Sequence, residues 1–414
     1  MSLYSFLEQA IFAILTFLLI STLARVAPQN VFGIFAACQG IAAISYFLAG
    51  SFLSYPLLFY KWTKGSEPPV ARISYVTTVS LAFSIGTACF VFISTASSSV
   101  EIAASVAVWA FGWPPYDVLR RIGYIYNKYF LLIFAHVLTM LPPIAFAHWG
   151  TCASSHVIQI CLPYSGLMML CSFFMCFHYI CGLRLSSAIR TTSITWHRTR
   201  WHLHIGKSLV AAKLLYMLPV TLAPLILLYF YGPSQSAAWQ VLYTIATIPN
   251  ALIFILGTHI VKMTAMRDGV QSIPGAHTRT ARILIFAIFP LVAATPYLAL
   301  LGCDDILRKI FGDHHFQSTD NSVAIALASG LAASLTHLHM CYFLGMRKPQ
   351  MAIMHSITFF LFACVATLLL PEFFPDSRAH QIALYSWGIA SICSLLISIF
   401  DIVRNWPMLK CRQQ

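Results

Sequence analysis

The feature that most constrains the fold is a succession of apolar runs separated by short polar turns. Each run has roughly the 20 residues that an α-helix needs to cross the hydrocarbon core of a bilayer. Twelve such runs can be marked, and they divide into two sets of six. We expect the spans at 5–26, 32–58, 71–95, 100–122, 128–148, 156–181, 208–231, 236–260, 280–302, 321–345, 350–371 and 380–402.

The composition agrees with this interpretation. The chain has 414 residues, of which 59% are hydrophobic and 9% are charged, whereas soluble domains carry roughly 25% charged residues. No stretch remains for a separate soluble domain, and most of the 12 cysteines lie inside apolar runs, where a thiol is a small buried side chain rather than half of a disulfide. We therefore predict an all-α, polytopic membrane protein.

The net charge of +13 is explained mainly by membrane topology, so it does not imply a nucleic-acid partner. If both termini lie in the cytoplasm, 20 of the 25 lysines and arginines fall on the inner side and four on the outer side, with Lys213 inside the seventh span. This strong asymmetry satisfies the positive-inside rule. We expect a multi-pass membrane protein with cytoplasmic termini.

The longest inner loop divides the chain near its middle. We expect an amino-terminal six-helix lobe at 1–181, a cytoplasmic linker at 182–207 and a carboxy-terminal six-helix lobe at 208–414. The linker contains tryptophans and arginines, which favour the level of the lipid headgroups. A zinc site is a weaker alternative because its three histidines have no acidic or cysteine partner nearby. They are His197, His202 and His204.

The second lobe resembles a repeat of the first. "LLISTLARVAPQNVFGIFAACQGIAAI" and "LAPLILLYFYGPSQSAAWQVLYTIATI" each contain an apolar helix, a Pro-containing polar turn, an aromatic residue and a second apolar helix. Pro28 then matches Pro233, with the register uncertain by one residue. Because each set has an even number of spans, the repeat is parallel, and such repeats are typical of transporters with a central path between two lobes.

Ionisable residues at membrane depth are functional candidates, because burying a charge in a span is costly. Glu8 lies in the first span and Lys213 at the matching place in the seventh. One hypothesis is a Glu8–Lys213 ion pair between the lobes. The alternative is that both side chains extend to the nearby inner surface. Either way, Glu8 is a candidate countercharge or ion-coupling group.

The fourth span contains "FGWPPYDVLRRIGYIYNK", in which Asp117 and Arg121 are spaced to pair on one helix face. Arg120 then points elsewhere and is left free for a phosphate, which guanidinium groups can bind through two hydrogen bonds. The alternative is that both arginines only mark the cytoplasmic end of a helix. We predict Arg120, Arg121 and Lys213 as cationic substrate contacts and Asp117 as a countercharge.

Arg25 ends the first span on the outer side, which topology leaves poor in cations. Its repeat partner is Phe230, or Tyr229 in the other register, so the turn itself does not require a positive charge. We therefore add Arg25 to the predicted substrate contacts. The alternative is a helix-end arginine that extends to the membrane surface.

Other chemistry has little support in the sequence. We interpret the histidines inside spans, such as His136 and His355, as hydrogen-bonded contacts between helices rather than as proton carriers. Phosphate-binding loops, metalloprotease motifs and nucleophile elbows are missing, and we find no cofactor or metal motif. We therefore expect a protein that is not an enzyme.

Several segments together resemble one family. "FLEQAIFAILTFLLISTLARVAPQNVFGIFAACQGIAAI" is similar to the first hairpin of bacterial polysaccharide flippases of the multidrug/oligosaccharidyl-lipid/polysaccharide exporter superfamily, in which A-R-x-L-G-P-E-E-F-G joins two helices. Ala24, Arg25, Phe32 and Gly33 match, whereas residues 28–31 depart from the pattern. "DVLRRIGYIYNK", "YGPSQSAAWQVLYTIATIPNALIFILG" and "LGMRKPQMA" resemble later parts of the same family.

The resemblance implies two lobes around a cavity that opens alternately to either face. It implies movement of a polyprenyl-pyrophosphate-linked oligosaccharide from the cytoplasmic to the outer leaflet for cell-surface polysaccharide synthesis, with cationic residues on the pyrophosphate. Coupling to a proton or sodium ion is common in the family, and the location that the resemblance implies is a bacterial inner membrane. The expected partners are the lipid-linked oligosaccharide, membrane lipids, a polysaccharide polymerase and other assembly proteins, and the expected state is a monomer.

Three other functions remain open. A drug or metabolite antiporter of the same superfamily would be expected to have a deep acid in the amino-terminal lobe, which here offers only Glu8. A membrane oligosaccharide polymerase or ligase would need a long outer loop with catalytic groups, whereas the only sizeable outer loop, at 302–321, is about 20 residues long. An uncoupled lipid scramblase or assembly subunit is the third.

Overall fold

The structure is a computed structural model, and it describes residues 3–64, 70–149, 156–181, 196–247, 304–312, 320–345, 349–374 and 377–404. All secondary structure in these ranges is helical. Within them, nine helices are long and apolar enough to cross a membrane. The chain is therefore a multi-pass membrane protein, and the predicted all-α class is confirmed.

The helices of the first half are separated by short turns. Their bounds are α1 Leu3–Val26, α2 Gln29–Ala49, η1 Gly50–Ser54, α3 Tyr55–Lys64, α4 Val70–Thr95, α5 Val100–Ile125, α6 Tyr129–Trp149 and α7 Val157–Cys181. Those of the second half are α9 Trp196–Tyr231, α10 Pro233–Ala246, α13 Asp304–Phe311, α14 Asp320–Gly345, α15 Pro349–Phe373 and α16 Ala379–Arg404.

Nine of the predicted spans correspond to the nine apolar helices. The fourth predicted span is α5, which is 26 residues long but more highly charged, since it contains an Asp, a Glu and two Arg. The eighth is described as far as α10, and the ninth, 280–302, lies outside the described residues. Residues 196–207 of the predicted linker are helical and belong to α9, whereas 182–195 are outside the description. The lobe boundaries stay a prediction.

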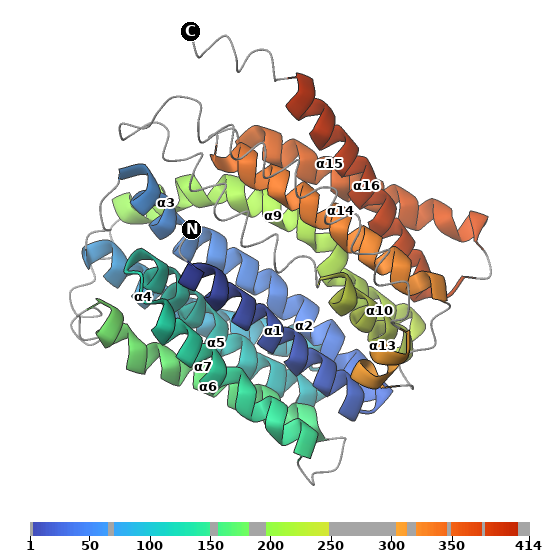
Figure 1. Cartoon of the computed structure of the whole chain (residues 1–414), viewed down its shortest axis with the longest axis horizontal. Coiled ribbons are helices and arrows are strands. Elements are labelled where there is room, and N and C mark those ends of the chain that lie inside the picture. Colours follow the sequence, from blue (N-terminus) through green and yellow to red (C-terminus); the bar gives the residue numbers. More distant parts are fainter. Residues whose placement is uncertain are drawn as a thin grey trace.

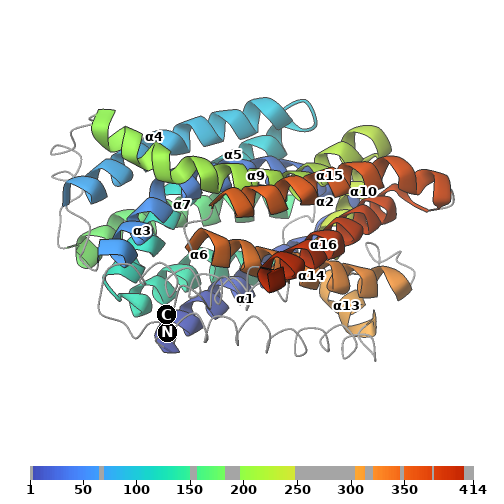
Figure 2. The ribbon, with the colours of Figure 1, turned by 90° about the horizontal axis from the view of Figure 1, so that it is seen from above.

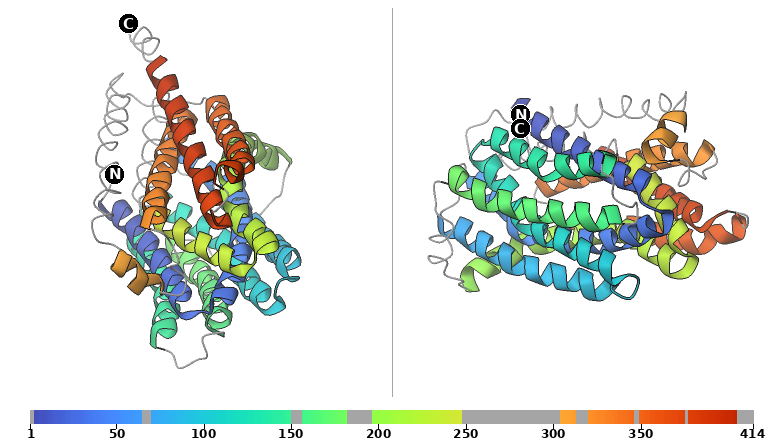
Figure 3. Two further views of the ribbon diagram at one scale, coloured as in Figure 1. Left: turned by 90° about the vertical axis from the view of Figure 1, so that its right-hand side faces the viewer. Right: turned by 90° about the horizontal axis from the view of Figure 1, so that it is seen from below.

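The two halves form separate groups of helices that meet along α2, α9 and α10. In the first group α5 packs against α4 and α7, and α1 packs against α6; in the second, α14, α15 and α16 pack together (Figures 1 and 3). Helix α9 runs along α2 and also contacts α15 (Figure 2). If one lobe moved against the other, the contacts along this seam between the halves would change.

Small residues allow close contact along the seam. A Cβ atom added to Gly33 would lie 2.0 Å from the carbonyl oxygen of Pro233, and one added to Gly40 would lie 2.0 Å from that of Thr221. The hydroxyl of Ser236 donates to the carbonyl of Gly33 at 2.9 Å. Close backbone approach through small residues is how membrane helices associate without a hydrophobic driving force.

The span that begins with α2 contains a π-helical turn. Helix α2 continues through η1 into α3 as one 30-residue apolar segment, Gln29–Leu58. At the turn, the amide of Tyr55 donates to the carbonyl of Gly50, five residues back. Single π turns inside α-helices occur frequently at functional sites, and this one lies directly beside the charged residues described next.

Candidate functional site

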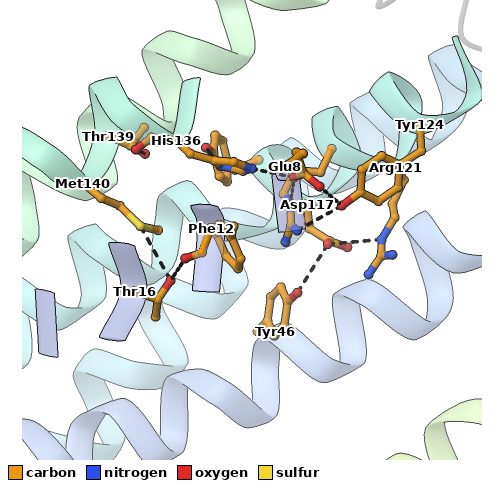
Figure 4. Close-up of polar contacts among 12 residues, drawn as sticks. Glu8, Phe12, Thr16, Tyr46, Asp117, Arg121, Tyr124, His136, Thr139 and Met140 are labelled. Carbon is orange, nitrogen blue, oxygen red and sulfur yellow. Dashed lines mark hydrogen bonds and ion pairs between the residues drawn. The ribbon is translucent and has the colours of Figure 1, made fainter. Parts of the chain in front are cut away.

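The carboxylate of Glu8 is the centre of a buried polar cluster inside the first half. The Glu8 side chain is fully buried. Its Oε1 accepts from Arg120 Nε at 3.2 Å and contacts His136 Nε2 at 2.6 Å, and its Oε2 accepts from the Tyr124 hydroxyl at 2.5 Å (Figure 4). With Tyr116, these residues form what we term the Glu8 cluster. They come from α1, α5 and α6, so the cluster ties three helices of one lobe together.

The charge and the hydrogen-bonding capacity of the Glu8 carboxylate are matched within the Glu8 cluster itself. The Tyr116 hydroxyl lies 2.5 Å from His136 Nδ1. If Tyr116 donates there, a neutral His136 donates from Nε2 to Glu8. Arg120 supplies the single positive charge, and its guanidinium also lies 3.8 Å from the centre of the Phe12 ring. The cluster is therefore neutral overall, as buried charges generally must be.

The carboxylate of Asp117 is the centre of a second group. Arg121 Nε lies 3.4 Å from Asp117 Oδ1, and the Tyr46 hydroxyl donates to the same oxygen at 3.4 Å (Figure 4). The Ser54 hydroxyl, from the π turn, donates to Oδ2. Asp117 is almost fully buried, whereas the Arg121 side chain keeps 19% of its surface exposed. Arg121 is thus held at one end and accessible at the other.

Lys213 of α9 brings a further positive charge to the same place from the second half. Its Nζ lies 5.4 Å from the centre of the Tyr55 ring, at the start of α3. Its charge interacts with those of Asp117 and Arg121. We term Asp117, Arg121 and Lys213 the interface site. It holds two positive charges and one negative charge, so it is net positive and lies where the two halves meet.

Three sequence-based interpretations of these residues are wrong, and one is confirmed. Glu8 does not pair with Lys213 or extend to the surface, because Arg120 and His136 enclose it within the first lobe. Arg120 is not free in this structure, because Glu8, Tyr124 and Phe12 surround its guanidinium, and its predicted contact with a substrate stays a prediction. The predicted pairing of Asp117 with Arg121 at i, i+4 is present.

Arg25 lies apart from the other predicted residues. It is exposed in the last turn of α1. It stands 17 positions after Glu8 on this helix, which at a rise of about 1.5 Å per residue places the two roughly 25 Å apart. The structure therefore brings Asp117, Arg121 and Lys213 together and leaves Arg25 at the opposite end of the span. Its predicted substrate contact stays a prediction.

Where the structure describes the linker histidines, they do not come together as the alternative zinc site would require. His202 is buried, and its Nδ1 lies 3.1 Å from the carbonyl oxygen of Phe52, whereas His204 is exposed. The side chain of His197 lies outside the described residues. Among the residues that the structure does describe, no three metal-ligating side chains come together.

The hydroxyl groups that complete the Glu8 cluster and the surroundings of Asp117 were not predicted from the sequence. Tyr124 stands four residues after Arg120, a spacing that could have indicated a contact on one helix face. Tyr116, Tyr46 and Ser54 are uncharged residues in apolar runs, and no local pattern relates them to Glu8 or Asp117. Their contacts depend on how helices distant in sequence pack together.

Comparison with protein-family models finds no match to this sequence, and comparison with curated proteins finds none either. Comparison with solved structures does find similar folds. A MATE protein in a bent conformation is 11% identical with a TM-score of 0.67, covering 100% of this chain and 95% of its own. An outward-facing multidrug resistance MATE family transporter of the MOP superfamily is 11% identical with a TM-score of 0.69. That match covers 98% of this chain and 95% of the transporter.

The chain has the MATE transporter fold. Solved proteins with the MATE fold include inward-facing as well as outward-facing states. A third neighbour, a MOP superfamily transporter from Pyrococcus furiosus, is 12% identical with a TM-score of 0.66, covering 98% of this chain and 95% of its own. That protein is described as having a binding pocket of reverse polarity that suggests a different function. The two-lobe arrangement predicted from the sequence is thus the arrangement of the MATE fold.

Proposed function

We propose that this protein moves a polyprenyl-pyrophosphate-linked oligosaccharide from the cytoplasmic to the outer leaflet by alternating access of its two lobes. The observation that carries the proposal is the net positive charge of the interface site, to which each half of the chain contributes. The MATE fold supports the transport mechanism, and the resemblance of the sequence to polysaccharide flippases supports the substrate class. The protein would serve cell-surface polysaccharide synthesis.

The chemistry of the interface site suits a pyrophosphate. The Arg121 side chain is partly exposed, and a guanidinium can present a fork of two donors that matches the oxygens of a phosphate. Lys213 adds a second charge from the opposite lobe. Asp117 holds Arg121 in place and acts as its countercharge. A pyrophosphate bound here would contact both lobes at once, so its binding energy could favour one relative position of the lobes over another.

The proposed orientation places this site near the leaflet where the substrate is made. Both Glu8 and Asp117 lie toward the end of the bundle at which the chain begins, and the positive-inside rule assigns that end to the cytoplasm. The lipid-linked substrate would enter there from the inner leaflet, and its tail would stay in the bilayer. In this proposal the protein is in a bacterial inner membrane.

Transport of cationic drugs is the second candidate, because two of the solved neighbours are multidrug transporters. The charges of the described sites argue against it. Glu8, one of two buried acids that the structure describes in the first lobe, already carries Arg120 as its partner, and the interface site, which contains the other acid, Asp117, is net positive and would repel a cation. A neighbour with reverse pocket polarity illustrates that this fold is compatible with other substrates.

Reconstitution of the purified protein tests the proposal. Proteoliposomes would carry a fluorescent polyprenyl-pyrophosphate oligosaccharide in one leaflet, and a membrane-impermeant quencher would report its appearance in the other. We expect translocation that needs the protein and that falls in an Arg121→Gln variant. Failure to move this lipid, together with movement of a cationic dye under an imposed proton or sodium gradient, would favour the drug antiporter. The same gradients, applied with the lipid substrate, would identify a coupling ion.

A further inference from the structure

The π turn Gly50–Ser54 lies where the first lobe touches the amino-terminal part of α9, beside Tyr75 of α4, whose hydroxyl donates to Thr199 of α9 at 3.2 Å. A π turn carries one residue more than an α-helical turn, so it leaves backbone carbonyl groups available for other partners. Here the carbonyl of Gly50 accepts from the Tyr55 amide, and its oxygen lies 3.1 Å from the Ser54 hydroxyl oxygen. Other groups of the turn contact the first lobe on one side and α9 on the other.

On the side of the first lobe, the turn is held by Asp117. The Ser54 hydroxyl donates to Asp117 Oδ2, and a Cβ atom added to Gly50 would lie 3.6 Å from the same oxygen. Asp117 also pairs with Arg121. The carboxylate therefore connects the π turn directly to the interface site.

On the side of the second lobe, the turn is held by α9. His202 Nδ1 donates to the carbonyl of Phe52 at 3.1 Å, which links the two halves through a side chain and a backbone oxygen of the π turn. Gly206, one turn further along α9, packs directly on the π turn: a Cβ atom added there would lie 2.9 Å from the carbonyl oxygen of Ser51 and 2.7 Å from the Phe52 ring. Lys213 then lies over Tyr55.

We infer that the π turn and α9 form a latch that keeps the lobes together at the Glu8 end of the bundle, and that this end opens only when His202 and Gly206 leave the turn. The inference rests on the proposed alternating access. Because α2 and α3 reach the turn from opposite sides, movement of the turn would separate α3 from α9 without disturbing the packing of α2 against α10.

The latch is placed to respond to the substrate. An anionic headgroup that binds Arg121 competes with Asp117 for the guanidinium, and Asp117 is the group that holds Ser54. The same anion would attract Lys213 away from the Tyr55 ring. The first change frees the carboxylate that holds Ser54 to move, and the second removes a contact between α9 and Tyr55, the residue that follows the π turn. A bound pyrophosphate would therefore loosen the latch, whereas the empty site keeps it closed.

Distance measurements between the lobes test the latch in the full chain. Spin-labelled unnatural amino acids at Phe130 on α6 and Met354 on α15, both exposed near the Glu8 end, leave the native cysteines unchanged. Double electron–electron resonance in lipid nanodiscs then reports the separation of the lobes. We expect Gly206→Leu to shift most of the population to longer distances, because the added side chain cannot fit against Ser51 and Phe52.

A matched glycine supplies the control. Gly86 on α4 has open space around its Cβ position, so Gly86→Leu should keep the wild-type distances. His202→Ala should shift part of the population, and His202→Asn, which can still donate to the Phe52 carbonyl, should shift less. Thermal unfolding of each variant identifies any that fails to fold, in which case the milder Gly206→Ala replaces Gly206→Leu.

The outcomes separate the latch from the proposed function. Unchanged distances in both Gly206→Leu and His202→Ala would overturn the latch while leaving translocation of the lipid substrate intact as a separate result. Wild-type distances that lengthen on adding the lipid-linked pyrophosphate would support both. Lengthening in Gly206→Leu, without translocation of that lipid by the wild type, would support the latch and reject the substrate.

Discussion

Arg120 and Arg121 are neighbours in the sequence, yet they occupy two different kinds of site. Arg120 is enclosed by groups of its own lobe, with its charge matched by Glu8 and its guanidinium on the Phe12 ring. Arg121 is only partly enclosed, and Lys213 from the other half lies within electrostatic reach. A step of about 100° around the helix separates them. One arginine holds a lobe together and the other is available to a ligand.

The difference predicts that disruption of the Glu8 cluster has the largest effect, and that the effect is on stability. Glu8→Ala leaves the buried Arg120 charge and His136 without their shared acceptor. Removing one partner of a buried ion pair typically costs about 3–5 kcal/mol. We expect a large fall in thermal stability and in the yield of monodisperse protein, measured by fluorescence-detected chromatography after heating.

The control removes both charges of the Glu8 cluster. Glu8→Gln combined with Arg120→Met should recover part of the lost stability, because replacing a buried pair by neutral groups is far less costly than leaving one charge alone. A double variant that is less stable than either single variant would contradict the pairing of Glu8 with Arg120.

Changes at Arg121 should act mainly on transport and cost less stability than changes at Glu8, because Asp117 keeps the Tyr46 and Ser54 hydroxyls as donors and Arg121 is partly exposed. Arg121→Gln removes a charge-assisted hydrogen bond to the proposed anion, which typically contributes about 1.5–3 kcal/mol. That corresponds to a loss of translocation rate of about tenfold to a hundredfold. Arg121→Lys keeps the charge without the fork and should recover part of the rate. The comparison would fail if Arg121→Gln unfolded the protein while Arg120→Gln lowered only the rate.

Lys213 should contribute less than Arg121, because it is a point charge that is only partly buried. Exposed and partly exposed charges contribute about 1 kcal/mol or less, so we expect Lys213→Gln to lower translocation about two- to fivefold. The loss should shrink as the salt concentration rises, since salt already screens the charge in the wild type. A loss that is independent of salt would indicate that Lys213 acts through packing on Tyr55 rather than through its charge.

The fold could be predicted from the sequence more fully than the site. Apolar runs of membrane length determine the spans, and the i, i+4 spacing of Asp117 and Arg121 is a local property of one helix. The partner of Glu8 depends instead on α1 packing against α5 and α6, which no spacing within α1 encodes. The π turn could not be predicted either, because the sequence "GSFLS" is equally compatible with an ordinary α-helix. Sequence patterns thus located the charged residues, but they could not show that Arg120 rather than Arg121 is enclosed by partners from its own lobe.

Arg25 gives the smallest expected effect and tests whether the division between enclosed and available arginines extends to the far end of α1. It is exposed in the last turn of that helix, roughly 25 Å from Glu8. Arg25→Ala should leave thermal stability within about 0.5 kcal/mol, as for most surface changes. If Arg25 meets the substrate as it leaves on the outer side, the same variant should lower translocation up to about fivefold, since exposed charges contribute about 1 kcal/mol or less. Arg25→Lys should then restore part of the rate. Unchanged translocation in Arg25→Ala would instead make it a helix-end arginine that extends to the membrane surface, and the substrate contacts would be confined to the interface site.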